Sequence, residues 1–314
     1  MKKIFDDKRL MIRVCDLYYN KGLKQEEIAR RMEISRPTVS RIISNARKEG
    51  IVKIEVVNPF QHNYFQTERE LEDKYGLKEV IISDDYLDDA EGKYHLGQAC
   101  AKYLQRTLAD DEIVGISMGR TIKQVSPHIK FEKFSNINFI PLLGGMGQVG
   151  IEYHCNQIVI DFARAFGGKF HLLHAPAYIS DEDLMKSLKK DIHISQVFDL
   201  MENITTAVVG IGTEMEGSTM MESEYYNRED IREFKSLGIV GDVCLQMYDI
   251  NGNTDYPYNN HIFGYDIKNL RKIRRSIGVA SGEEKIEAIY GAIKGGFVNV
   301  LVTDNLTARM LLDK

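Results

Sequence analysis

Short apolar runs alternate with helical patterns from Gly76 to the end of this 314-residue chain. The runs typical of strands are 79–83, 113–117, 137–142, 169–173, 206–211, 238–246, 276–280 and 298–303. Helical patterns fall between most of them, at 93–108, 156–165, 285–294 and 306–312. This alternation predicts a largely parallel sheet that helices cover on both faces. We therefore expect a doubly wound α/β domain over residues 76–314.

Glycine-rich and hydroxyl-rich loops follow several of these strands, and ligands of open α/β sheets bind outside the carboxyl ends of strands. Ser117 to Thr121 follows one apolar run and precedes a helical pattern. Free N–H groups at a helix start and the Thr121 hydroxyl favour an anion, and Gly119 lets the backbone approach it. Arg120 can add two parallel hydrogen bonds to a phosphate. A tight turn without a ligand is the alternative.

Other loops carry groups suited to a sugar phosphate. Lys285 lies early in a helical pattern, where a cation is unfavourable unless an anion binds nearby. Gly144 and Gly145 permit close approach of the backbone. The side chain of Asp242 can accept hydrogen bonds from sugar hydroxyls. His154 and Asn156, at the start of another helix, are further candidates to contact hydroxyls, although His154 also suits a packing role.

Residues 1–58 predict a helix-turn-helix domain of three short helices and a β-like run at 51–56. The second helix is expected at 25–32 and the third at 36–48. Ser35 can cap the third helix, and Pro37 fits its first turn. Glu33 occupies a turn position at which glycine is common, so a left-handed residue there is mildly strained.

The third helix is the expected recognition helix, because its exposed N-terminal side chains can enter a major groove. Arginine can bridge guanine O6 and N7, while serine and threonine reach bases or phosphates. Arg47 suits a phosphate contact. The candidate DNA-binding residues are Gln25, Ser35, Arg36, Pro37, Thr38, Ser40, Arg41 and Arg47. A packing module with no role in DNA binding is the alternative.

The charge distribution favours the same division of the chain. Residues 1–58 contain 14 Lys and Arg against 8 Asp and Glu, a net charge of +6, and the remainder contains 27 against 38, a net charge of −11. A basic head on an acidic body indicates that only the head binds a polyanion. We expect double-stranded DNA as the partner of the first domain.

Residues 59–75 are expected to form a linker helix in which Tyr64, Leu71 and Tyr75 share one face. That face predicts either packing on its own chain or a dimer seam. The four cysteines are scattered, so neither a metal site nor a disulfide framework is expected. A charged N-terminus and the lack of a long apolar run favour a cytoplasmic protein without a membrane partner.

In its motifs the chain resembles the SorC family of sugar-responsive transcriptional regulators. The resemblance covers nearly the whole chain and rests on 23–29 and 34–41 in the head, and on 115–121, 141–147, 240–242 with 249–252, 278–285 and 300–304 in the body. It implies an effector domain related in fold to sugar-phosphate isomerases, an operator-binding activity modulated by a phosphorylated sugar, and a dimer or tetramer. It also implies that Lys285 contacts the phosphate.

Two other functions remain open from the residues. A sugar-phosphate isomerase would need a carboxylate base and a partner acid, for which Asp242 and Asp304 are the candidates, with no cofactor. The third possibility is a regulator that no longer responds to an effector. The presence of Arg120, Thr121 and Lys285, which suit a phosphate, counts against it. Leu143 stands where a lysine could capture an aldehyde as an imine, so covalent capture at that position is excluded.

Overall fold

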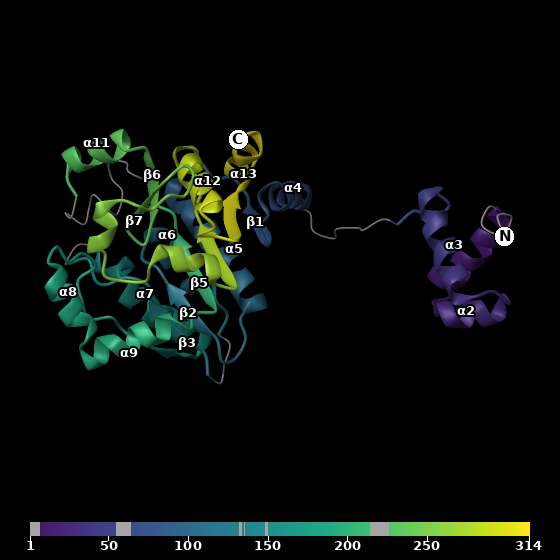
Figure 1. The fold of residues 1–314 in the computed structure, drawn as a ribbon, viewed down its shortest axis with the longest axis horizontal. Helices are drawn as coiled ribbons and strands as arrows, with labels where there is room; N and C mark the ends of the chain where they lie inside the picture. The colour runs from purple at the N-terminus through teal and green to yellow at the C-terminus, as the bar shows by residue number, and fades with distance from the viewer. Residues whose placement is uncertain (1–6, 55–63, 132–133, 135, 148–149, 214–225) are drawn as a thin grey trace. The chain divides into compact units, whose positions relative to one another are not determined.

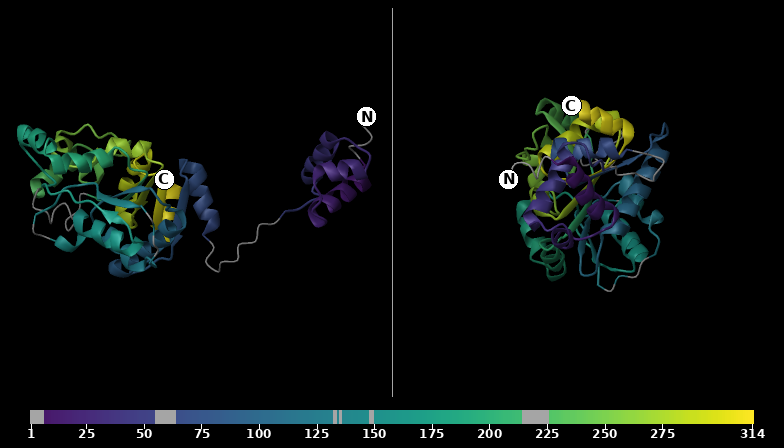
Figure 2. Two further views of the ribbon diagram at one scale, coloured as in Figure 1. Left: turned by 90° about the horizontal axis from the view of Figure 1, so that it is seen from below. Right: turned by 90° about the vertical axis from the view of Figure 1, so that its right-hand side faces the viewer.

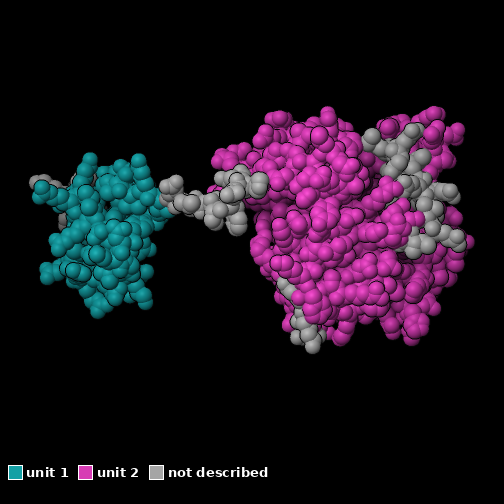
Figure 3. All heavy atoms as spheres, turned by 180° about the vertical axis from the view of Figure 1, so that it is seen from behind, with its two compact units in different colours: residues 1–63 teal, residues 64–314 magenta. Residues whose placement is uncertain are grey.

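The computed structural model describes residues 7–54, 64–131, 134, 136–147, 150–213 and 226–314. The chain forms two compact units, residues 1–63 and 64–314, which Figure 3 colours separately. Residues 64–75, expected to lie in a separate linker, group with the second unit. No helix within the described ranges is long and apolar enough to cross a bilayer.

The first unit is a three-helix module. Its elements are α1 (Lys8–Cys15), continued by a π-helical segment (Asp16–Asn20), α2 (Gln25–Arg31) and α3 (Arg36–Lys48). Met11, Val14, Ile28, Val39 and Ile42 are fully buried between these helices. The expected β-like run does not form over residues 51–54, where Ile51 and Val52 instead pack on the helices; Val56 lies outside the described residues.

The turn between α2 and α3 has the strained geometry expected from the sequence. Glu33 adopts a φ of 54°, in the left-handed region that side chains other than glycine rarely occupy. Ser35 then caps α3, since its Oγ accepts a hydrogen bond from the Thr38 N–H at 3.3 Å and contacts the Thr38 hydroxyl at 2.8 Å. Pro37 lies in the first turn, where its missing N–H has no helical partner to lose.

A seven-stranded sheet forms the centre of the second unit, and all of its neighbouring strands are parallel (Figure 1). The expectation of a doubly wound, mostly parallel sheet is confirmed. Across the sheet the strands are β1 (Glu79–Ser83), β9 (Val300–Asp304), β8 (Arg275–Val279), β5 (Thr206–Gly210), β2 (Ile113–Ile116), β3 (Asn138–Pro141) and β4 (Lys169–Phe170).

The run at 238–246, expected as a strand of this sheet, forms part of a separate antiparallel hairpin. The hairpin consists of β6 (Ile239–Val243) and β7 (Gln246–Asp249). Its two-residue turn places Cys244 at a φ of 53° and Leu245 at 61°. Hairpin turns with two left-handed residues usually contain Asn or Gly. Because neither is present here, the sequence pattern gave no sign that the strand turns back.

Helices cover both faces of the sheet, as the two views of Figure 2 show for the second unit. Adjacent residues of one strand pack in opposite cores: Val208 faces one core, and Ala207 and Val209 face the other. The helices are α4 (Phe65–Tyr75), α5 (Asp89–Thr107), α6 (Arg120–Lys123), α7 (Cys155–Phe166), α8 (Glu182–Lys189), α9 (Ile192–Met201), α11 (Arg228–Ser236), α12 (Ile286–Lys294) and α13 (Asn305–Asp313).

Helix α4 packs on its own chain, which was one of the two expectations for it. Leu71 is fully buried, and the Tyr75 hydroxyl donates to the Leu311 carbonyl of α13. The carboxylates of Glu72 and Glu68 accept hydrogen bonds from the backbone N–H groups of Val80 and Ile82, at 2.9 and 3.0 Å. The helix thus covers the outer edge of β1, and its Leu71 face is not available as a dimer seam.

A buried ion pair joins the amino ends of the three central strands. Arg275 at the start of β8 donates to both carboxylate oxygens of Glu112, the residue before β2, and to the Thr206 hydroxyl of β5. That hydroxyl in turn donates to Glu112 at 2.8 Å. Burial by itself would raise the pKa of Glu112, but the hydrogen bonds from Arg275 and Thr206 outweigh it and hold the pKa below its ordinary value.

We expect Glu112→Gln to lower the free energy of unfolding by about 3–5 kcal/mol, because it leaves a buried guanidinium without a counter-charge. The control is the double variant Glu112→Leu with Arg275→Met, which removes both charges and should lose less. Urea unfolding measures both. A loss in the single variant no larger than in the double variant would show that the pair does not stabilise the sheet.

Candidate functional site

A cavity of about 580 Å³ lies at the carboxyl end of the sheet, where strands β2 and β5 are neighbours. The chain leaves β2 toward β3 on one side and leaves β5 toward β8 on the other. Divergent connections of this kind open a crevice in which doubly wound proteins bind ligands. The cavity is lined by the segments after β2 and β5, the start of α5, the hairpin turn and the segment after β8.

The structure brings six of the ten predicted effector residues together around this cavity. They are Ser117, Gly119, Arg120, Thr121, Asp242 and Lys285. Gly144, Gly145, His154 and Asn156 are not part of its lining. The six come from three segments that are distant in the sequence, and the sheet topology is what unites them.

The four residues outside the lining have structural partners. A Cβ on Gly144 would lie 2.6 Å from the Ala175 carbonyl, so glycine is needed for the close approach of two loops. The Gly145 N–H donates to that same carbonyl at 2.8 Å. The Asn156 side chain makes two hydrogen bonds of 3.1 Å with the backbone of Leu173. His154 is the N-cap residue that precedes α7, and its carbonyl accepts a hydrogen bond of 3.1 Å from the Ile158 N–H.

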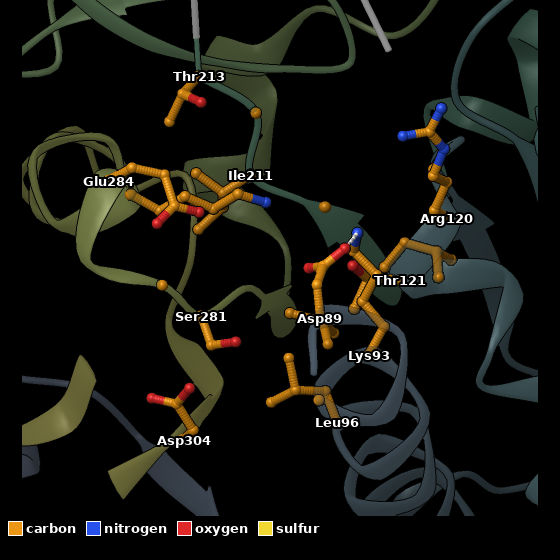
Figure 4. A pocket seen from close by; sticks show the side chains of 18 of the residues that line it. Asp89, Lys93, Leu96, Arg120, Thr121, Ile211, Thr213, Ser281, Glu284 and Asp304 are labelled. Atoms are coloured by element: carbon orange, nitrogen blue, oxygen red, sulfur yellow. Dashed lines mark hydrogen bonds and ion pairs between the residues drawn. The ribbon is translucent and has the colours of Figure 1, made fainter. Parts of the chain in front are cut away.

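Hydrogen bonds to neighbouring segments of the protein fix the loop after β2. The Ser117 hydroxyl donates to the Met118 carbonyl and accepts from the Gly210 N–H, both at 3.0 Å, which links the ends of β2 and β5. Gly119 adopts a φ of 134°, and its N–H donates to the Tyr153 carbonyl. The Arg120 guanidinium lies over the Tyr153 ring and points away from Thr121 (Figure 4). Thr121 is therefore the loop side chain that best faces the cavity.

Asp242 is placed at the cavity by the hairpin. Its backbone pairs with Gly212 in both directions, and a Cβ at Gly212 would lie 2.0 Å from Asp242 Oδ1. Its Oδ2 accepts a hydrogen bond of 3.0 Å from the Leu245 N–H. Burial raises the pKa of Asp242 to about 6, against the smaller opposing effects of the Leu245 N–H and the Lys285 charge. This carboxyl group can both accept from and, when protonated, donate to a hydroxyl.

The positive side of the cavity includes a residue that sequence reasoning missed. Lys93, in the second turn of α5, lines the cavity with Lys285 and forms an ion pair with Asp89. Burial lowers the pKa of Lys285, and the nearby charge of Lys93 lowers it further. The sequence pattern gave only a helix at 93–108. The side chain of Asp88 caps α5, so the helix begins at Asp89 and not at Lys93 as expected. This cap is the sequence signal that was overlooked.

Hydrogen bonds from Tyr64 and from the start of α13 fix the segment that links β1 to α5, part of which lines the cavity. Asp84 accepts a hydrogen bond of 2.7 Å from the Tyr64 hydroxyl of α4. Asp85 accepts from the Asn305 side chain at 2.8 Å and from the Leu306 N–H at 2.6 Å. Asp304, the other carboxylate considered for acid–base chemistry, caps α13 by accepting from the Thr307 N–H at 2.8 Å.

On the first unit, the predicted DNA-binding residues of α3 form a largely exposed face. Arg36, Pro37, Ser40 and Arg41 are exposed, whereas Thr38 is half-buried beside its cap. Gln25 is half-buried in the first turn of α2. Arg47 donates from Nε to the Tyr19 hydroxyl at 2.8 Å and lies over that ring, so part of its hydrogen-bonding capacity is used within the unit.

Comparison with known proteins identifies both units. The Sugar-bind family model, a sugar-binding domain, matches residues 60–313, and a model of region 4 of sigma-70 matches residues 13–49. The chain belongs to the SorC family of sugar-responsive transcriptional regulators. It is a transcription regulator with a helix-turn-helix unit and a sugar-binding unit.

Relatives of this SorC-family regulator match along its whole length. The chain is 31% identical over 310 residues to the deoxyribonucleoside regulator of Bacillus subtilis and 31% identical over 311 residues to the sorbitol operon regulator of Klebsiella pneumoniae, each match covering 98% of both chains. The full-length structure of the latter covers 98% of this chain and 99% of its own, with a TM-score of 0.74 and 29% identity. A DeoR-family regulator from Listeria monocytogenes covers 79% of this chain and 98% of its own, with a TM-score of 0.72 and 28% identity.

We expect Asp242→Asn to lose less stability than the parent as the pH rises from 5 to 8. A carboxyl whose folded pKa is raised from 3.8 to about 6 opposes folding once it ionises, so the penalty grows between these values and is complete above pH 6. Urea unfolding at pH 5 and pH 8 should show a smaller loss of stability in the variant than in the parent. Asp249→Asn is the matched control on β7: hydrogen bonds from Asn253 and its neighbours outweigh burial and lower the pKa of Asp249, so this variant should lose stability at pH 8. An unchanged pH dependence in Asp242→Asn would contradict the assignment.

Proposed function

We propose that this protein controls a carbohydrate-metabolism operon and that a phosphorylated sugar in the cavity changes its binding to operator DNA. The observation that carries this proposal is the pairing of Lys285 and Lys93 with Asp242 in one cavity of about 580 Å³. Ammonium groups favour a phosphate, while a carboxyl group favours sugar hydroxyls. The names of the relatives, which refer to sorbitol and to deoxyribonucleosides, support the control of a carbohydrate-related operon.

A sugar-phosphate isomerase is a weaker reading of the same cavity. Of the two carboxylates that sequence reasoning considered, Asp304 is engaged as a helix cap, and Asp242 accepts from the Leu245 backbone. Neither pairs with a second acid in a way that would support proton transfer between two substrate carbons. The helix-turn-helix unit also has no use in such an enzyme.

The effector test is a thermal-shift screen with phosphorylated sugars, each beside its dephosphorylated form. A compound at 100 times its Kd adds about 2.7 kcal/mol of apparent stability, which such a screen detects. We expect only phosphorylated compounds to shift the parent, and Lys285→Ala to lose most of the shift while still binding DNA. Equal shifts from both forms of one sugar, or an undiminished shift in Lys285→Ala, would place the phosphate elsewhere.

The DNA-binding proposal rests on the exposed N-terminal half of α3. We expect Arg36→Ala and Arg41→Ala each to weaken specific operator binding by about 1–3 kcal/mol, because each removes a side chain able to bridge a guanine. Arg9→Ala on α1 is the control, since Arg9 is exposed but lies outside the recognition helix. Fluorescence anisotropy at fixed salt measures all three. Parent-like binding by both α3 variants would rule out α3 as the recognition helix.

We also propose that the protein acts as a dimer or tetramer in the cytoplasm. A single helix-turn-helix reads one short half-site, and symmetric operators are bound by paired heads. The Leu71 face of α4 is already packed on its own chain, so the contact between copies uses another surface. Light scattering of the full-length chain measures its mass, and a monomer at working concentration would overturn this part of the proposal.

A further inference from the structure

Helix α5 brings to the effector cavity an ion pair whose carboxylate, that of Asp89, has no role in the function proposed above. Asp89 and Lys93, four residues apart, both line the cavity and bind each other. Their exposure differs: 23% of the Lys93 side chain is accessible to solvent, against 82% of the Asp89 side chain. The cation is therefore held in place by its surroundings, while the carboxylate can move into solvent.

The carboxylate of Asp89 acts on two ammonium groups at once. It pairs with Lys93. Burial lowers the pKa of Lys285; the charge of Glu284 opposes this most strongly, Lys93 adds to the lowering, and Asp89 contributes a smaller opposing effect. Lys93 and Lys285, which come from different segments, therefore share one region of the cavity. Figure 4 shows Asp89 and Lys93 next to Thr121, with a dashed line between the two charged groups.

The carboxylates near these two ammonium groups belong to Asp89, Glu284 and Asp242, and of these Asp89 is the one that forms an ion pair with Lys93. A phosphate monoester carries a charge of about −1.5 to −2 at neutral pH and has three strong acceptor oxygens. It can thus accept from Lys93, Lys285 and the Thr121 hydroxyl together, which a single carboxylate on a helix cannot do. Arg120 is not part of this group, because its guanidinium points away over Tyr153.

We propose that Lys93 is a second phosphate-binding cation beside Lys285, and that Asp89 is an internal anion that competes with the effector phosphate for Lys93. The proposal rests on the proposed function and adds to it a residue that weakens effector binding. Asp89 sets the phosphate concentration to which the regulator responds. Competition for Lys93 predicts that removing the Asp89 charge has no effect once Lys93 is absent, whereas a general attraction of anions would make the effects of the two charges additive.

Equilibrium dialysis of the full-length chain against radiolabelled inorganic phosphate, at constant ionic strength kept with chloride, tests this assignment. We expect Asp89→Asn to bind phosphate about threefold to tenfold more tightly, because the competing charge is lost, and Lys93→Met to bind at least about tenfold more weakly. The double variant should resemble Lys93→Met. Asp88, which caps α5, is left unchanged in every variant, so the helix start is preserved.

The matched control is the exposed pair of Glu182 and Lys186 on α8, which has the same four-residue spacing and lies outside the cavity. Glu182→Gln and Lys186→Met should leave phosphate binding unchanged. If Lys285→Ala loses phosphate but Asp89→Asn and Lys93→Met bind like the parent, the competition is wrong while the proposed function stands. If the parent shows no saturable phosphate binding, or Lys285→Ala retains it, both assignments are wrong.

Discussion

The ion pair of Glu112 and Arg275 fixes the amino ends of β2, β5 and β8 against one another. These three adjacent strands then reach the opposite end of the sheet in a set register, for example Val114 beside Thr206 and Thr206 beside Arg275. The connections beyond their carboxyl ends diverge, and the cavity lies between them. A charged network in the core at one end of the sheet thus helps to fix the positions of the groups that line the cavity at the other end.

Strain and unfavourable charge gather at the cavity. Cys244 and Leu245 hold left-handed backbone angles without being glycine or asparagine, and they line the cavity together with the half-buried carboxyl of Asp242. Features of this kind cost about 1–3 kcal/mol each and persist only where the surrounding structure enforces them. Here the bridge between Gly212 and Asp242 and the packing of the hairpin on α12 provide that support. In return for this cost, the groups that line the cavity are held in a fixed arrangement.

Much of the fold could be predicted, because most strands of the large sheet and several of the helices have a clear local signal. The third helix of the first unit, at 36–48, was predicted with its observed bounds, since Ser35, Pro37 and Gly50 mark its ends. The cavity residues Ser117, Thr121 and Lys285 follow strands or begin helices, which is where ligands are expected. The hairpin was missed because its turn residues are unusual. Gly144 was assigned to the ligand because sequence cannot tell a glycine that admits a neighbouring loop from one that admits a ligand. Asn156 was assigned to it because sequence does not reveal that its side chain bonds the backbone of Leu173.

The carboxylates of Glu68 and Glu72 occupy the outward N–H groups of Ile82 and Val80 on the edge strand β1. An edge strand with unsatisfied backbone groups would accept a strand from another molecule. Here such a strand would have to break two hydrogen bonds and displace a helix whose Leu71 is fully buried. Another copy of this protein could therefore not extend the sheet at β1 without first displacing α4. The same two glutamates therefore protect this edge of the sheet from backbone pairing with another molecule.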